Sequence, residues 1–221
     1  MSAYSPTSSR PVAPSGDLSG LSVVDGCRQV SYRGRVTTTS ASASALPPRD
    51  AASWLRQLTR SYPDFPTPGI LFRDLTPVFA NGDAFAAVVD ELAQLVLPGV
   101  IAVAGVEARG FLLAAAIAQS RGCGVVAVRK AGKLPGAVLT ESYELEYGRA
   151  QLEIHADVLE AGARVVLVDD LLATGGTLTA ATRLLERARC VVDAIGVVVE
   201  LDALKGRDRL EGHRVVSILS Y

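Results

Sequence analysis

The sequence is poor in the residues and patterns that several classes of protein require. Its three cysteines, Cys27, Cys123 and Cys190, lie far apart and show no CxxC spacing, which argues against a disulfide framework and against a zinc site. No apolar stretch approaches the roughly 18 residues needed to span a bilayer, and the N-terminus lacks the continuous apolar core of a signal peptide. These absences favour a cytoplasmic protein in a reducing setting, with no membrane partner.

Neither sign of charge is in excess. The 22 Lys and Arg residues oppose 23 Asp and Glu residues, which leaves a formal net charge of −1 and a pI near 6.1. The chain therefore has no global attraction for nucleic acid or for an anionic membrane, and any anionic ligand must be held by local groups. The two histidines, His155 and His213, are far from each other and from any cysteine, so neither is expected to bind a metal.

What is present indicates one folded domain behind a low-complexity extension. With 49% hydrophobic residues, a chain of 221 residues can bury one substantial core. Residues 1–49 are rich in Ser, Thr, Pro and Ala and include the run TTTSASASA at 37–45, a composition that buries little surface and predicts a disordered extension. Residues 50–221 are expected to form the folded domain. An unprocessed tail or a misplaced start codon explains the extension better than an organellar transit peptide does.

Beyond Asp50, a candidate helix N-cap, apolar strands alternate with helical patterns. This alternation predicts an α/β fold whose parallel sheet is covered by helices on both faces. Between Ser142 and His155 the apolar pattern has a period near two, which indicates an antiparallel hairpin that projects from the sheet. Strands are expected over residues 100–104, 124–128, 165–169 and 191–201, and helices over residues 84–97, 111–119 and 178–188.

The most informative segment is VVLVDDLLATGGT, residues 165–177. A buried strand of a parallel sheet would carry Asp169 and Asp170 to its carboxyl end, where open α/β sheets bind their ligands. The small residues that follow can wrap a phosphate group with backbone N–H groups at the N-terminus of the next helix. Carboxylates beside a phosphate site suit a sugar phosphate, because ribose hydroxyls can donate hydrogen bonds to them. The alternative is an ordinary strand end followed by a glycine turn.

Two further segments place positive charge beside glycine. GVEARGF at 105–111 puts Arg109 between an expected strand and an expected helix, where N–H groups and a fixed cation could bind a diphosphate. RKAGKLPG at 129–136 puts Lys130 and Lys133 in a glycine-bounded loop that leads into the hairpin. Such a loop suits a mobile lid that closes over an anionic substrate. For both segments the alternative is a solvated, charged connection.

Together these segments are similar to the adenine phosphoribosyltransferases of the type I phosphoribosyltransferase family. The matching strings are YPDFPTPGILFRD at 62–74, GVEARGF, RKAGKLPG, SYELEYG at 142–148, VVLVDDLLATGGT and ELDALKGR at 200–207, within a similarity that runs from about residue 51 to Tyr221. The resemblance implies a type I phosphoribosyltransferase fold, with a central, mostly parallel sheet, helices on both faces, a small hood and a flexible hairpin lid. It also implies a pentosyltransferase that moves the phosphoribosyl group of 5-phosphoribosyl 1-diphosphate (PRPP) to adenine, which yields AMP and diphosphate in purine salvage.

The resemblance assigns roles to individual residues. Glu146 in the lid is the implied general acid or base at the purine, with Tyr147 beside it. Mg²⁺ is the implied cofactor, held mainly by PRPP oxygens and water rather than by a protein cage, and a homodimer is the implied assembly. The other implied site residues are Asp169, Asp170, Ala173, Thr174, Gly175, Gly176 and Thr177 for the ribose and 5-phosphate, Arg109, Lys130 and Lys133 for the diphosphate, and Leu71, Phe72, Arg73 and Leu201 for adenine.

Rival functions remain open for the same segments. A phosphoribosyltransferase for xanthine, another purine or orotate would share the PRPP motif, although RKAGKLPG together with SYELEYG favours adenine. A PRPP-responsive transcription regulator on the same fold would keep VVLVDDLLATGGT. Such a regulator should also carry a folded, basic DNA-binding module, whereas this chain is slightly acidic and its extra segment is of low complexity.

Overall fold

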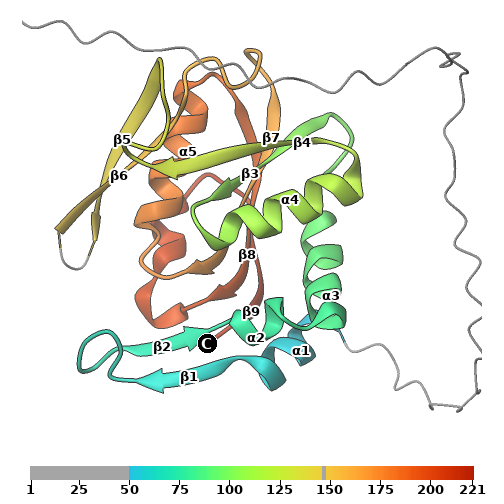
Figure 1. Cartoon of the computed structure of the whole chain (residues 1–221), viewed down its shortest axis with the longest axis vertical. Helices are drawn as coiled ribbons and strands as arrows, with labels where there is room; N and C mark the ends of the chain where they lie inside the picture. Colours follow the sequence, from blue (N-terminus) through green and yellow to red (C-terminus); the bar gives the residue numbers. More distant parts are fainter. Residues whose placement is uncertain (1–49, 146–147) are drawn as a thin grey trace, which may run out of the picture. The chain divides into compact units, whose positions relative to one another are not determined.

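A seven-stranded sheet forms the centre of the domain that follows residue 49 (Figure 1). The computed structural model describes residues 50–145 and 148–221. Along the sheet the strand order is β5-β6-β4-β3-β7-β8-β9. The five strands from β4 to β9 in this order run parallel, whereas β5 pairs antiparallel with β6 and β6 antiparallel with β4. The bounds are Val100–Val106 (β3), Gly124–Lys130 (β4), Val138–Leu145 (β5), Gly148–His155 (β6), Arg164–Leu172 (β7), Val191–Glu200 (β8) and Val215–Ser220 (β9).

The central strands are buried on both faces, as their continuous apolar runs predicted. In β7, residues 165–168 are fully buried, which is typical of a parallel sheet with helices on either side. The hairpin expected between Ser142 and His155 is confirmed as β5 and β6, and it joins the sheet at the edge of β4. The predicted fold class, a mostly parallel sheet in an α/β protein, is therefore confirmed.

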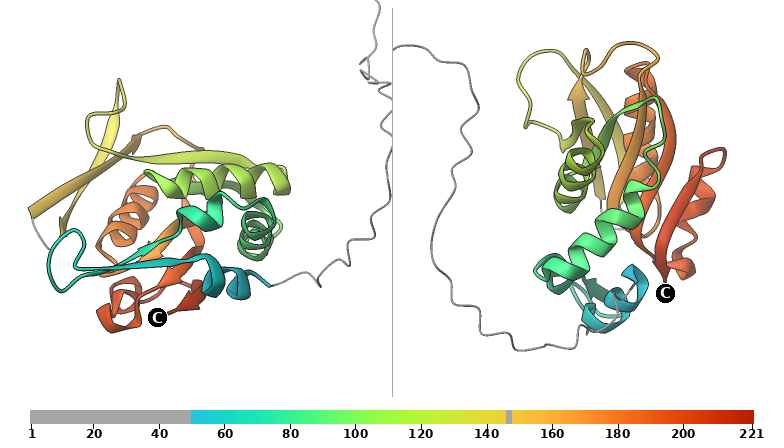
Figure 2. Two further views of the ribbon diagram at one scale, coloured as in Figure 1. Left: turned by 60° about the horizontal axis from the view of Figure 1, so that its bottom comes forward. Right: turned by 90° about the vertical axis from the view of Figure 1, so that its right-hand side faces the viewer.

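Helices cover both faces of the sheet (Figure 2). Helices α1 to α4 share one hydrophobic core with the sheet, and α5 shares a second core with its other face. The first core contains Leu92, Ile117 and Val166, and the second contains Leu184 and Leu167. The bounds are Ala51–Leu58 (α1), Thr76–Phe79 (α2), Gly82–Ala93 (α3), Arg109–Arg121 (α4) and Gly176–Arg187 (α5), with 3-10 helices at Asp202–Leu204 (η1) and Gly206–Leu210 (η2). None of the helices within the described ranges has the length and apolar character needed to cross a membrane.

The first helix begins where the sequence predicted. Asp50 is the N-cap of α1, and its carboxylate accepts a hydrogen bond from the Ser53 N–H at 2.6 Å. Such a bond satisfies one of the backbone donors that the first turn of a helix leaves unpaired. Leu55 on the same helix is completely buried, and Trp54 and Leu58 pack against the same core.

A second, two-stranded antiparallel sheet forms the hood, which we define as residues 60–74. It consists of β1 (Arg60–Pro63) and β2 (Leu71–Asp74). Phe65 in the connecting turn packs edge-on against Phe72, with ring centres 5.1 Å apart. The apolar pattern predicted no strand here, because each strand has only four residues and prolines interrupt the segment. Strand β9 was also not predicted; its pairing with β8 becomes evident only in the folded sheet.

Candidate active site

The acidic pair lies within β7, as the sixth and seventh of its nine residues, rather than after its end. Asp169 and Asp170 are 9% and 6% exposed. The Asp169 Oδ1 accepts the Asp170 N–H at 2.9 Å, and the Asp170 Oδ2 accepts the Arg109 Nε–H at 2.5 Å. Arg109 begins α4, so the end of β3 and the end of β7 meet at this point. The sequence predicted that Arg109 belongs to a diphosphate site. The structure shows in addition that Arg109 contacts the acidic pair directly, at Asp170.

The surroundings of the two carboxylates differ. Burial, and then the neighbouring charge of Asp170, raise the pKa of Asp169 well above its ordinary value. Asp170 instead has the guanidinium of Arg109 beside it. Asp170 is therefore held as the partner of Arg109, whereas Asp169 carries a desolvation cost when it is ionised. A ligand with hydroxyl donors could offset that cost.

The loop after β7 opens helix α5 as predicted. Gly175 is the N-cap of α5 with a φ of +80°, a left-handed conformation that glycine adopts at little cost. Gly176 and Thr177 form the first turn of the helix, and Ala173 and Thr174 precede it. The N–H groups of this turn have no partner within the helix, which makes the loop a suitable site for a phosphate.

The phosphate loop rests on a backbone segment that sequence reasoning did not identify. Gly206, at the start of η2, approaches so closely that an added Cβ would lie 2.1 Å from the Ala173 carbonyl oxygen. In the opposite direction, a Cβ on Gly175 would lie 2.3 Å from the Gly206 carbonyl oxygen. Gly206 lies in ELDALKGR, one of the strings that match the family. Nothing in the local pattern of that string indicated that Gly206 packs against a loop about 30 residues earlier.

An ion pair between a partly exposed arginine and a buried carboxylate holds this supporting segment. Arg207 donates from Nε to Glu200 Oε1 at 2.9 Å and from Nη2 to Glu200 Oε2, and its Nη1 also donates to the Val215 carbonyl oxygen at 2.8 Å. Glu200 ends β8 and is 5% exposed. The hydrogen bonds from Arg207 lower the pKa of Glu200. The pair therefore connects η2, whose first residue Gly206 contacts the phosphate loop, to β8 and β9.

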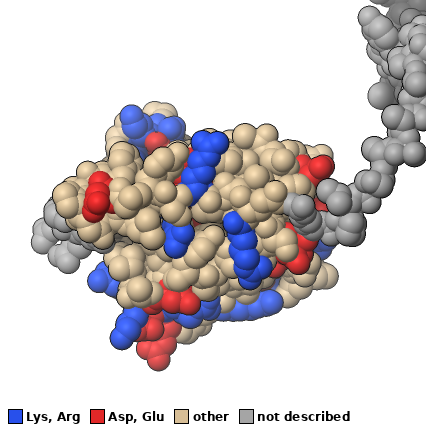
Figure 3. Space-filling model, turned by 90° about the horizontal axis from the view of Figure 1, so that it is seen from below, with Lys and Arg blue, Asp and Glu red and all other residues tan. Residues whose placement is uncertain are grey.

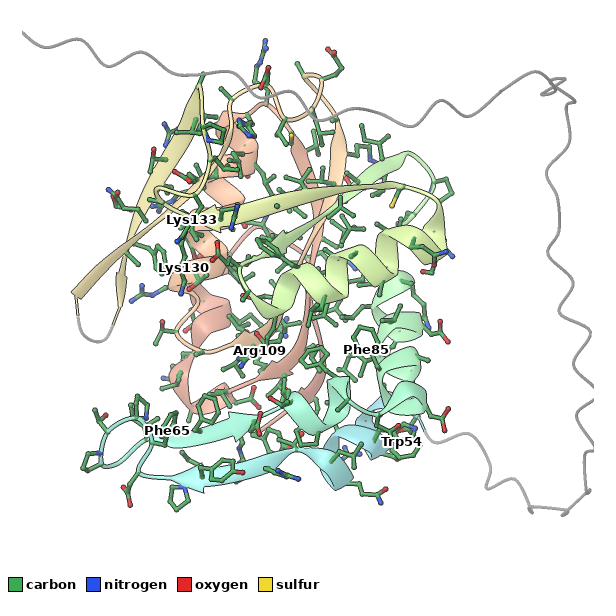
Figure 4. The ribbon with its side chains drawn as sticks, viewed as in Figure 1. Trp54, Phe65, Phe85, Arg109, Lys130 and Lys133 are labelled. Carbon is green, nitrogen blue, oxygen red and sulfur yellow. The ribbon has the colours of Figure 1, made fainter. Side chains whose placement is uncertain are left out.

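The basic loop after β4 is fixed by two carboxylates. The Lys130 N–H donates to Glu107 Oε2 at 3.0 Å, and Glu107 precedes α4, joined to Ala108 by a cis peptide bond. Glu153 of β6 accepts the N–H groups of residues 132, 133 and 134, and these bonds, that of Gly132 first, lower the pKa of Glu153. Lys130 and Lys133 are exposed, and Figure 4 shows Lys133, Lys130 and Arg109 in succession from the hairpin toward the hood.

The hood contains three of the four residues predicted for adenine. Leu71, Phe72 and Arg73 make up most of β2, and Leu71 is 47% exposed. Arg73 Nη1 donates to Ser61 Oγ at 2.6 Å, and the Arg73 guanidinium lies 3.9 Å from the centre of the Tyr221 ring. Sequence reasoning did not include Tyr221. Leu201, the fourth residue predicted for adenine, is half-buried and follows β8, where its N–H donates to the Leu172 carbonyl oxygen at 2.9 Å.

The predicted lid residues Glu146 and Tyr147 lie outside the described residues. The adjoining ends of β5 and β6 extend to the same side of the domain as the turn of the hood (Figures 1 and 2). A polar cavity of about 380 Å³ lies between the hairpin and α5 and touches the phosphate loop at Gly176. The acidic pair is not part of its lining, so the cavity flanks the candidate site without enclosing it.

Charge at this end of the protein is local, as the neutral composition predicted. On the face seen in Figure 3, Lys and Arg side chains form separate groups among uncharged surface, with Asp and Glu between them. Among residues 50–145 and 148–221 there is no group of three or more His, Cys, Asp or Glu side chains that could hold a metal ion.

A parallel sheet that presents an acidic pair, a glycine loop at a helix N-terminus and a basic loop at one end defines a protein of the phosphoribosyltransferase class. The family model of the phosphoribosyl transferase domain matches residues 79–218. The adenine phosphoribosyltransferase of Clavibacter michiganensis is 61% identical over 175 residues, which cover 79% of this chain and 99% of the relative. That of an Arthrobacter species is 58% identical and covers 75% of this chain and 89% of the relative.

Solved structures agree with these relatives. The crystal structure of adenine phosphoribosyltransferase from Thermoanaerobacter pseudethanolicus matches with a TM-score of 0.73 and 44% identity, over 77% of this chain and 99% of the other. The enzyme from Giardia lamblia, solved with 9-deazaadenine, matches with a TM-score of 0.72 and 39% identity, over 78% and 98% of the two chains. The chain belongs to the adenine phosphoribosyltransferase family, and the predicted family is confirmed.

Proposed function

We propose that this chain transfers the 5-phosphoribosyl group of PRPP to N9 of adenine, forming AMP and diphosphate, as an adenine phosphoribosyltransferase (EC 2.4.2.7) of purine salvage. Family membership supports this activity, and one observation in the structure of this chain supports it as well. The buried pair Asp169 and Asp170 lies between Arg109 at the start of α4 and the glycine loop at the start of α5. A ribose phosphate needs hydroxyl acceptors and a phosphate loop side by side, and its diphosphate needs a cation next to them.

The acidic pair is proposed to bind the ribose and the loop its phosphate. The carboxylates of Asp169 and Asp170 would accept hydrogen bonds from the 2- and 3-hydroxyl groups, while the N–H groups of residues 173–177 would donate to the 5-phosphate. Fixing the ring in this way orients C1 toward the base, which lowers the entropic part of the barrier. The burial of Asp169 excludes water that would compete for these bonds.

Positive side chains are proposed to stabilise the leaving group. Cleavage of the bond between C1 and oxygen builds positive charge on the ribose and negative charge on the departing diphosphate. Arg109, Lys130 and Lys133 would face that diphosphate. The Arg109 guanidinium already contacts Asp170, so the same side chain can connect the ribose site with the leaving-group site.

Mg²⁺ is the proposed cofactor, and the donor set fits it. The described residues offer an adjacent pair of carboxylates, one of them occupied by Arg109, which is too little for an all-protein cage. Mg²⁺ commonly keeps several waters and binds through one or two carboxylates and substrate phosphates, so PRPP would supply most of its ligands. When bound, the ion would neutralise part of the diphosphate charge.

The base is proposed to lie under the hood. Backbone groups of Leu71, Phe72 and Arg73 would read the amino group of adenine, and Leu201 would contribute to an apolar wall. Glu146, with Tyr147 beside it, is proposed as the general acid or base at N7 or N9 of the purine. If so, Glu146→Ala should lower kcat far more than it raises KM, whereas a pure rise in KM would argue against acid-base catalysis.

The remaining proposals concern the organisation of the protein. Residues 50–221 are proposed as the catalytic domain, a cytoplasmic homodimer, with residues 1–49 as an extension of no catalytic role. The family match within residues 79–218 supports the position of the domain. Light scattering of the purified protein would determine the oligomeric state, and a variant that starts at residue 50 should keep full activity.

One assay tests the activity and its base selectivity together. Purified protein is incubated with PRPP and Mg²⁺ and, in parallel, with adenine, guanine, hypoxanthine, xanthine or orotate. Formation of AMP at a far higher kcat/KM than any other nucleotide is the expected result. If the protein prefers another base, that base is the substrate in place of adenine. If no phosphoribosyl group is transferred to any of the bases, the proposed function is refuted.

A further inference from the structure

A buried carboxylate outside the acidic pair binds three backbone donors at once. Glu153, on β6, is 3% exposed. Its Oε2 accepts the Gly132 N–H at 3.0 Å, and its Oε1 accepts the Lys133 and Leu134 N–H groups at 2.6 and 2.7 Å. Three successive N–H groups directed at one point form an anion-binding nest. In this chain the anion in the nest is the protein's own carboxylate.

The nest fixes the shape of the basic loop. Gly132 has a φ of +82°, which turns its N–H and those that follow toward the same carboxylate. Arg129 Nη1 donates to the Lys133 carbonyl oxygen at 3.3 Å, which closes the loop from the other side. Since the Lys130 N–H is already held by Glu107, the backbone between the two lysines is tied to a carboxylate at each end.

We propose that Glu153 is a positioning residue for the leaving group: its carboxylate orders residues 131–134 so that Lys130 and Lys133 are presented to the diphosphate. The inference rests on the proposed function, because it takes these lysines to be diphosphate ligands. Lysine side chains are flexible, and holding their backbone in advance reduces the ordering cost that binding would otherwise carry. Glu153 touches no reacting atom in this scheme and acts only through the loop.

The first test is Glu153→Gln, which preserves size but removes the charge and places an amide among N–H donors. We expect KM for PRPP and the inhibition constant of diphosphate to rise about 10- to 100-fold, as a displaced binding group would cause, while KM for adenine stays near the wild-type value. The matched control is Glu141→Gln on the same hairpin, because the Glu141 carboxylate pairs with Arg183 and Arg187 of α5 instead of the loop. The control should keep wild-type values for PRPP and diphosphate.

A second pair of variants covers the case in which Glu153→Gln does not fold. Gly132→Ala and Gly122→Ala both place a side chain at positive φ, and neither added Cβ meets an atom within 4 Å. Their intrinsic backbone cost is therefore similar, but Gly122 caps α4 before β4 begins, whereas the nest follows the end of β4. Gly132→Ala should weaken diphosphate binding, measured by titration calorimetry, and Gly122→Ala should not.

The outcomes separate this inference from the proposed function. If the wild-type protein transfers no phosphoribosyl group, the proposed function fails and the inference fails with it. If the wild type is active but Glu153→Gln or, where that variant does not fold, Gly132→Ala binds diphosphate and PRPP like the wild type, only the inference is refuted. An equal loss for adenine and PRPP would also refute it, since that result indicates a general structural role.

Discussion

Gly206→Ala is the most direct test of how the phosphate loop is supported. The added Cβ would lie 2.1 Å from the Ala173 carbonyl oxygen and 2.9 Å from the Gly175 backbone nitrogen. Real Cβ atoms essentially never come within 3.0 Å of such neighbours, so the two segments must separate by about 0.9 Å, the difference between 3.0 and 2.1 Å. The Leu172 Cδ1 atom, at 2.8 Å, can move with its side chain, but the other two atoms belong to the backbone and cannot swing aside in this way.

The expected loss follows from that displacement. A misplacement of about 1 Å in a binding group can cost on the order of 100-fold in rate. We therefore expect kcat/KM for PRPP to fall about 100-fold, which corresponds to roughly 2.7 kcal/mol of transition-state stabilisation. None of the three atoms nearest to the added Cβ belongs to the hood, so KM for adenine should change little.

The assay is steady-state kinetics with PRPP varied at saturating adenine, together with thermal unfolding. Gly82→Ala in the first turn of α3 is the control, because its added Cβ has no atom within 4 Å. The control should leave the kinetics unchanged and should not lower the melting temperature, because alanine favours a helix over glycine. A Gly206→Ala protein with wild-type kcat/KM for PRPP would refute the idea that this backbone contact sets the loop, and so would a loss explained entirely by unfolding.

Three further substitutions test the carboxylates. Asp170→Asn should lower kcat/KM for PRPP roughly 10- to 100-fold through loss of charged hydrogen bonds without unfolding the protein, and wild-type kinetics would contradict its role. Burial raises the pKa of Asp169, so the free energy of unfolding should fall as pH rises from the ordinary aspartate pKa toward the raised one. Asp169→Asn should therefore melt at a higher temperature at neutral pH while using PRPP poorly. An unchanged melting temperature would count against this account. Glu200 has a lowered pKa owing to Arg207, so its stabilisation is present above the ordinary glutamate pKa and is lost as pH falls through the lowered one. Glu200→Gln should cost about 1–3 kcal/mol at neutral pH, toward the lower end since Arg207 is partly exposed, and its unfolding free energy should depend less on acid pH than that of the wild type.

Local features of this protein were predictable from sequence because they depend on neighbouring residues. The N-cap at Asp50, the run that becomes β7, the hairpin after residue 137 and the glycine at the start of α5 each reflect a preference expressed within a few positions. The short, proline-interrupted strands of the hood and the edge strand β9 were not predicted, since too few residues carry each pattern. Their pairing depends on partners elsewhere in the chain.

The chemistry of the site divides in the same way. The sequence by itself determined which groups are available: two adjacent carboxylates, a phosphate loop, and cations at Arg109, Lys130 and Lys133. Only the tertiary structure decided that Arg109 pairs with Asp170 and that Glu153 holds the basic loop. The physical reason is that these contacts join residues 61 and 20 positions apart. No local preference specifies such pairs; they follow from strand order and from the burial of polar groups that must find partners.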